Sequence, residues 1–288
     1  MSRNKDRLGM GNSQPQNIPT PPQQTQQGDG GGGFSFVVPT EFVDLPSKGR
    51  FYSDSHPLHN TDVIEIKQMT AKEEDMLTSR SLLKKGVALD RALQSVIINK
   101  SINSDTLLVG DRNAILVAMR VSGYGNMYDT QITCPACTTQ QNYSFDLNNT
   151  ETYYGDTDIE TNLEDIGNGH FSTVLPRTGL AVIFRLMSGT DEKRSLKLIE
   201  TARKLKKDEN AVTTQLRSML VSVGESTEQK NIDYVVDNMP TSDSRHLRLM
   251  YKMVTPNVDM TQEFTCNTCD HEQELEVPLT ADFFWPDR

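Results

Sequence analysis

The sequence predicts an α+β fold built from two related modules. Three observations support this prediction: short strand-like patterns are interspersed with segments of helical periodicity, the order of these segments recurs along the chain, and each copy ends in a CxxC motif. The two motifs hold all four cysteines of the 288 residues, at Cys134 and Cys137 and at Cys266 and Cys269.

Composition narrows the classes of function. The formal net charge of −10 argues against nonspecific binding to nucleic acid or to an anionic membrane. No apolar run approaches the roughly 18 residues of a membrane-spanning helix, and the first residues lack the apolar core of a secretory signal. We therefore expect the chain to fold in a reducing cytosol, where paired cysteines favour metal binding or redox chemistry over structural disulfides.

Residues 1–33 form a low-complexity segment. Gly, Pro and Gln make up 17 of these 33 residues, and none is aromatic. Such a composition cannot bury enough apolar surface to offset the entropy lost on ordering, so we expect a disordered N-terminal tail. The alternative is an arm that folds onto a partner during assembly.

The first module is expected over residues 34–150. Thr70, with Glu73 three positions later, matches a capping box and predicts the start of a helix. The expected elements are a strand at 34–38, an LPSKG turn at 45–49, a strand at 63–69, helices at 70–83, at 89–99 and from Asp111, and two short strands around the first CxxC motif.

The second module is expected over residues 170–288, after an acidic linker at 151–169. It repeats the landmarks of the first: an LPRTG turn at 175–179, a strand and helix at 181–193, a helical tract that includes 211–223, and a helix opened by Asp243. The first cysteine of each CxxC motif lies 23 positions after Asp111 and after Asp243. This agreement indicates an ancient tandem duplication.

The spacing of the cysteines predicts a zinc site. One CxxC turn supplies two thiolates, and a structural zinc ion binds four in a tetrahedron, so Cys134, Cys137, Cys266 and Cys269 together would complete a zinc-ribbon-like site that joins the modules. A dithiol redox site and cysteines without metal are the alternatives. His271 is either a substitute ligand or a solvated neighbour of the site.

None of the motifs GxSxG, HExxH, P-loop or GxGxxG after a strand is present, so we predict no catalytic residue and no small-molecule substrate. The basic stretch Lys193–Lys207 carries Leu196, Ile199, Ala202 and Leu205 along one helical face. It predicts an amphipathic helix with a solvated basic face, or a contact with an acidic partner or with the acidic linker. The aromatic run Phe283–Trp285 either closes the core of the second module or anchors a partner.

Several stretches together resemble one protein family. LPSKGRFY, VIEIKQMTAKEEDML, the helical tract, the CxxC motifs and DFFWP look like the baseplate hub proteins of T4-like contractile-tailed bacteriophages, over residues from about 40 to 288. The resemblance implies a structural or assembly protein without known catalysis, made in the cytoplasm of the bacterial host. It also implies that other baseplate and tail proteins are the partners, and that the virion baseplate is a possible destination.

The alternative is a phage zinc-ribbon protein that binds nucleic acid or acts in transcription. Such a protein would need a basic stripe and aromatic side chains near the cysteines. The second CxxC motif is instead followed by DHEQELE, which is acidic.

Overall fold

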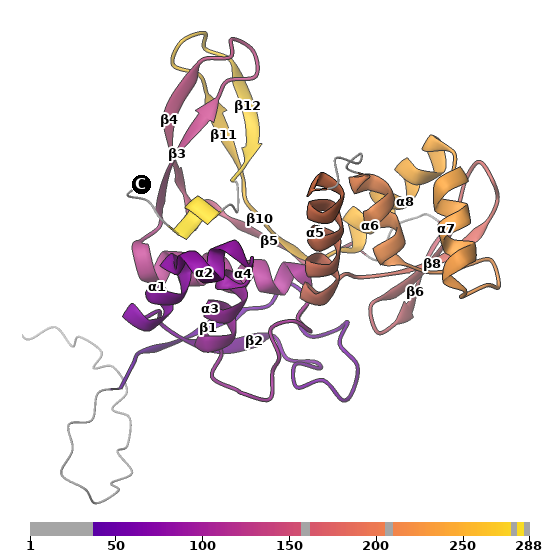
Figure 1. Cartoon of the computed structure of the whole chain (residues 1–288), viewed down its shortest axis with the longest axis horizontal. Helices are drawn as coiled ribbons and strands as arrows, with labels where there is room; N and C mark the ends of the chain where they lie inside the picture. Colours follow the sequence, from indigo (N-terminus) through magenta and orange to yellow (C-terminus); the bar gives the residue numbers. More distant parts are fainter. Residues whose placement is uncertain (1–36, 157–161, 205–209, 278–280, 285–288) are drawn as a thin grey trace, which may run out of the picture. The chain divides into compact units, whose positions relative to one another are not determined.

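The computed structural model describes residues 37–156, 162–204, 210–277 and 281–284. The expected tail at 1–33 lies outside the described residues, as do Leu205 and Trp285. Helices alternate with antiparallel strand pairs along the described chain, so the predicted α+β class is confirmed (Figure 1).

The first half of the chain opens with an antiparallel hairpin that starts at Thr40. The strand expected at 34–38 falls mostly outside the described residues, and its described end is not a strand. Pro39 cannot donate a backbone hydrogen bond to a ladder, which explains why pairing begins after it. The elements of this half are β1 (Thr40–Asp44), β2 (Val63–Lys67), α1 (Ala71–Thr78), α2 (Arg80–Lys84), α3 (Ala88–Val96), α4 (Val109–Tyr124), β3 (Met127–Thr133), β4 (Gln140–Asp146) and the 3₁₀ helix η1 (Leu147–Asn149).

The helix expected at 70–83 is divided into α1 and α2. Ser79 between them has an extended backbone (φ −63°, ψ 109°). Thr78 and Ser79 are weak helix formers, and the Thr78 hydroxyl donates to the carbonyl of Glu74 in its own helix. These local bonds favour an end to α1, and the carbonyl of Ser79 then accepts from Leu83 to begin α2.

The segment expected to be an acidic linker contains two strands. β5 (Glu151–Tyr153) pairs with β10 (Asn257–Asp259), and β6 (Leu163–Gly167) pairs with β7 (His170–Val174). Both strands gain backbone hydrogen bonds while their acidic side chains stay exposed, so the acidic composition does not prevent strand formation.

The second half contains a four-stranded antiparallel sheet in the order β6, β7, β8 (Ala181–Arg185) and β9 (Leu220–Val223). Its last strand corrects the expected helical tract at 211–223, because the helix ends at Met219 and the chain continues as a strand that pairs with β8. Leu220 and Val223 are buried in that position, and β-branched valine suits a strand better than a helix. The remaining elements are α5 (Gly189–Lys204), α6 (Ala211–Met219), α7 (Gln229–Asn238), α8 (Thr241–Val254), β11 (Thr261–Thr265), β12 (Glu272–Glu276) and the 3₁₀ helix η2 (Ala281–Phe284).

Two large cores hold these elements, and each includes residues from both halves. Phe51 of the first half packs in the core of the β6–β9 sheet. Phe283 and Phe284 pack in the core of the first half, where the ring of Phe283 meets that of Tyr128 edge-on at 5.2 Å. The expectation that these phenylalanines close the second module is therefore wrong. Buried Arg120 of α4 donates to the Phe283 carbonyl, and this bond ties η2 to the first half.

Candidate metal centre

Each CxxC motif lies in the turn of a two-stranded hairpin. β3 and β4 flank Cys134 and Cys137, and β11 and β12 flank Cys266 and Cys269 (Figure 1). The backbone N–H of the first cysteine donates across the turn, from Cys134 to Thr139 and from Cys266 to His271, at 2.9 Å in both hairpins. The two turns thus use the same hydrogen bond at the same position.

The residue after each second cysteine has a left-handed backbone. Thr138 has φ 58° and Asp270 has φ 52°, a conformation that residues other than glycine adopt infrequently. In each turn the N–H of this residue donates to the carbonyl of the first cysteine, at 2.9 Å in one and 3.0 Å in the other. The tight turn brings the two sulfurs of each motif to one side.

The four sulfur atoms lie within 4.8 Å of one another. The Sγ atoms of Cys134 and Cys269 are 3.8 Å apart, and those of Cys137 and Cys266 are 3.7 Å apart. A tetrahedral zinc ion with bonds of about 2.3 Å separates its ligands by about 3.8 Å, whereas a disulfide would bring two sulfurs to about 2.05 Å. The arrangement therefore fits a four-thiolate metal site.

Contacts between the hairpins hold the sulfurs together. The Tyr143 hydroxyl donates to the Glu263 carbonyl at 2.7 Å, and the Gln141 side chain accepts from the N–H of Asn267 at 3.0 Å. Phe264 packs with the cysteines in a small cluster beneath the turns. The two hairpins form one scaffold, although more than 100 residues separate them in sequence.

Electrostatics in the cluster favours a bound cation. Hydrogen bonds from Thr139 lower the pKa of Cys137 to about 6. A hydrogen bond from the N–H of His271 lowers the pKa of Cys269. The neighbouring sulfurs of Cys137 and Cys266, together with burial, have a larger effect in the opposite direction and raise that pKa to about 12. Four adjacent thiols cannot all ionise beside one another unless a positive charge offsets their repulsion, and a divalent metal supplies it.

His271 is not part of the cluster. Its backbone carbonyl completes the second turn, and its ring lies 3.3 Å from the Gln273 side chain. A reactive dithiol ordinarily lies at the start of a helix, yet a strand follows each CxxC turn here. The geometry favours a closed structural site, since four protein sulfurs leave no position for water.

A second set of contacts links buried carboxylates to the LPxxG turns. Asp111 accepts from the Ser47 N–H at 2.9 Å and from its hydroxyl at 2.6 Å, and also from the Tyr52 hydroxyl at 2.7 Å. Asp243 accepts from the N–H groups of Arg177 and Thr178 at 2.7 and 3.1 Å. The sequence pattern marks both aspartates as helix starts but gives no sign of these partners.

Two further carboxylates bind the strand before their helix. Lys67 at the end of β2 donates to Glu73 at 2.7 Å, and Glu73 also accepts from the N–H of Thr70. Arg185 at the end of β8 donates two bonds to Asp191, which accepts in addition from the N–H of Ser188. The basic and acidic residues are six positions apart in both cases.

Comparison with family models places the chain among structural components of phage tails. The matching family is described as T4 bacteriophage base plate protein, and the match spans residues 38–285, so the chain belongs to this family. No curated protein and no solved structure matches the chain. Within the described residues, no helix is both long enough and apolar enough to cross a bilayer.

Proposed function

We propose that the chain is a hub subunit or hub assembly factor of a phage tail baseplate. It acts by binding other baseplate and tail proteins, not as an enzyme, and it is assembled in the cytoplasm of the bacterial host. Membership of the baseplate family supports this role. The acidic net charge supports a protein partner over nucleic acid.

In this proposal one structural zinc ion binds Cys134, Cys137, Cys266 and Cys269. The observation that carries it is the group of four sulfur atoms within 4.8 Å, with paired distances of 3.7 and 3.8 Å. Zinc accepts four thiolates in this geometry, and such a site stabilises the fold without taking part in a reaction.

We further propose that residues 34–150 and 170–288 are duplicated modules. The zinc ion joins them through a zinc-ribbon-like pair of hairpins. The connecting segment at 151–169 and the tail at 1–33 lie outside the modules. Asp111 and Asp243 both accept from the third residue of an LPxxG turn, Ser47 in one module and Arg177 in the other. The Lys67–Glu73 and Arg185–Asp191 pairs also occupy equivalent places. Equivalent contacts at equivalent positions support a common origin.

Two measurements test the function. Metal analysis of the full chain should give one zinc per molecule. If the chain is a hub subunit, baseplates purified from infected cells should contain it. If it is an assembly factor, partly assembled hubs should contain it. Absence from both kinds of particle would contradict the baseplate role. A chain free of zinc after purification without chelators would contradict the metal site alone.

A further inference from the structure

Helix α5 exposes two of its leucines. Leu196 is 55% exposed and Leu198 is 54% exposed, and the buried positions of α5 among the described residues are Gly189 and Asp191. A surface helix ordinarily turns its apolar stripe toward the core. Leu196 and Leu198 of α5 thus face solvent, whereas Ile199 and Ala202 are half-buried.

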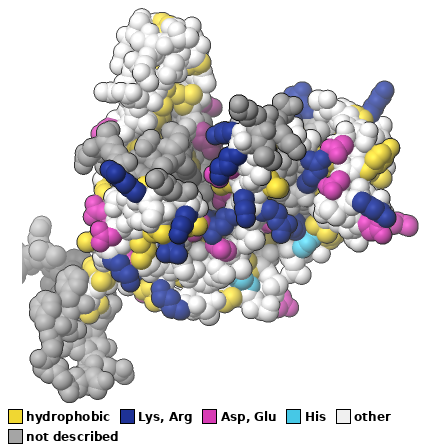
Figure 2. All heavy atoms as spheres, viewed as in Figure 1, with side chains coloured by type: hydrophobic (Ala, Val, Ile, Leu, Met, Phe, Trp, Pro, Cys, Tyr) yellow, Lys and Arg dark blue, Asp and Glu magenta, His cyan; other side chains and the backbone are white. Residues whose placement is uncertain are grey.

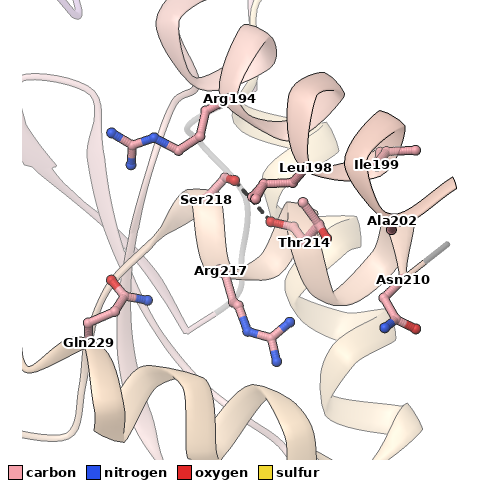
Figure 3. A pocket seen from close by; sticks show the side chains of 9 residues that line it. All are labelled: Arg194, Leu198, Ile199, Ala202, Asn210, Thr214, Arg217, Ser218 and Gln229. Carbon is pink, nitrogen blue, oxygen red and sulfur yellow. Dashed lines mark hydrogen bonds between the residues drawn. The ribbon is translucent and has the colours of Figure 1, made fainter. Parts of the chain in front are cut away.

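A groove lies beside Leu198, between α5, α6 and α7. Its volume is about 360 Å³, and Figure 3 shows the side chains that surround it. Leu198, Ile199 and Ala202 of α5 supply the apolar part of the lining. The polar lining consists of Arg194, Asn210, Thr214, Arg217, Ser218 and Gln229.

The described lining of the groove contains two arginines and no carboxylate, although the protein as a whole is acidic. Lys and Arg side chains gather around α5 in Figure 2. Among the described residues, neither Arg194 nor Lys197 has a carboxylate within ion-pair distance. Arg217 differs, because Asp233 and Asp237 of α7 already pair with it. Arg194 and Lys197 thus remain available to a partner.

We propose that this groove is the docking site for an acidic amphipathic helix of another baseplate protein, an inference that rests on the proposed function. Apolar side chains spaced three or four residues apart would cover Leu198 and Ile199, and carboxylates on the flanks would meet Arg194 and Lys197. Charge complementarity selects an acidic partner, and exposed leucines select one with an apolar face. No aromatic side chain lines the groove to stack nucleic-acid bases, so the described lining favours a protein.

Binding of a defined probe to the full chain tests the groove itself. The probe is a fluorescent synthetic helix of about 20 residues with Leu on one face and Glu on the other, long enough to be helical when bound. We expect Leu198→Asp and Arg194→Glu each to weaken its binding about tenfold or more. Leu249→Asp and Arg245→Glu on α8 are matched controls, since Leu249 is 53% exposed and Arg245 is exposed, and they should bind as the wild type does.

Probe binding is compared between the α5 and α8 variants and between probes of different charge. Failure of the Glu-containing helix to bind, equal loss in the α5 and α8 variants, or tighter binding of a Lys-containing helix or of a DNA duplex would each overturn the proposal.

A second experiment measures how much of the chain is incorporated into baseplates or hub intermediates. It tests the groove and the baseplate role independently. A phage that carries Leu198→Asp should incorporate the chain at least tenfold less than one that carries Leu249→Asp. Equal incorporation of both variants would overturn the groove and leave the baseplate role standing. Absence of the wild-type chain from every baseplate particle would overturn the role, and peptide binding would still decide whether the groove takes an acidic helix.

Discussion

Buried carboxylates at the starts of helices tie these helices to the preceding turns and strands. Glu73 and Asp111 are fully buried, and a buried charge is costly unless hydrogen bonds and cations compensate for lost water. Glu73 has Lys67 as its cation, whereas Asp111 has only neutral donors, and burial raises the pKa of Asp111 against the effect of those donors. The two sites should therefore respond differently to pH.

Glu73 should stabilise the fold at neutral pH. Burial raises its pKa, but hydrogen bonds from Lys67, Ser95 and Thr70 outweigh burial and hold the pKa at about 2. A lowered carboxyl pKa contributes stability that is present above the ordinary value of 4.5 and is lost as pH falls toward 2. Glu73→Gln should thus lower the free energy of unfolding by about 3 kcal/mol at pH 7, measured by urea denaturation.

The pH dependence distinguishes this effect from a packing defect. The difference between wild type and Glu73→Gln should narrow between pH 5 and pH 3, because the wild-type carboxylate then loses its advantage. Glu74→Gln, at the exposed neighbouring position, should change stability by less than about 0.5 kcal/mol. A constant difference across this range would show that the charge of Glu73 is not the cause.

Sequence alone predicts some residue roles and not others. The CxxC spacing predicts that the four cysteines meet, and their sulfur atoms do lie within 4.8 Å of one another. The partners of Asp111 and Asp243 are 64 and 66 positions away, at Ser47 and Arg177, so no local pattern could reveal them.

At the level of elements, local periodicity predicts where helices form better than it predicts where they end or which elements pack against them. The pattern of α6 continues into Leu220 and Val223, but pairing with β8 converts these residues to a strand. β5 and β6 are missed because their exposed acidic residues suit a linker equally well. Periodicity also places Leu196 and Ile199 of α5 near one another, yet it does not say whether another element covers them.

The approach of α4 to the loop before β10 predicts a strict requirement for Gly110. A Cβ atom at Gly110 would lie 1.9 Å from the backbone carbonyl oxygen of Pro256, which cannot move like a flexible side chain. Gly110→Ala should lower the free energy of unfolding by about 2 kcal/mol or more, although alanine favours a helix. Denaturant titration measures this loss.

Gly123 in the same helix is the control. A Cβ atom there would meet only the terminal methyl group of Met69, at 2.4 Å, and that side chain can rotate away. Gly123→Ala should therefore be neutral or slightly stabilising. Equal losses in the two variants would indicate a general intolerance of α4 and not the contact with Pro256.

At the scale of the whole molecule, the cysteine site links two hairpins that are distant in sequence. Cys134→Ser should abolish zinc binding and loosen both hairpins, since the proposed ion would bind both. Hydrogen exchange followed by mass spectrometry should show faster exchange over 127–146 and over 261–276. Thr133→Ser, at the exposed neighbouring position, should leave exchange unchanged. Faster exchange in the first hairpin alone would mean that the metal is not shared.

X-ray absorption at the zinc edge of the purified full chain tests the central claim most directly. The four sulfur atoms within 4.8 Å predict a single shell of four sulfur ligands at about 2.3 Å. A shell with fewer than four sulfurs, or with nitrogen or oxygen in their place, would contradict a zinc ion shared by Cys134, Cys137, Cys266 and Cys269.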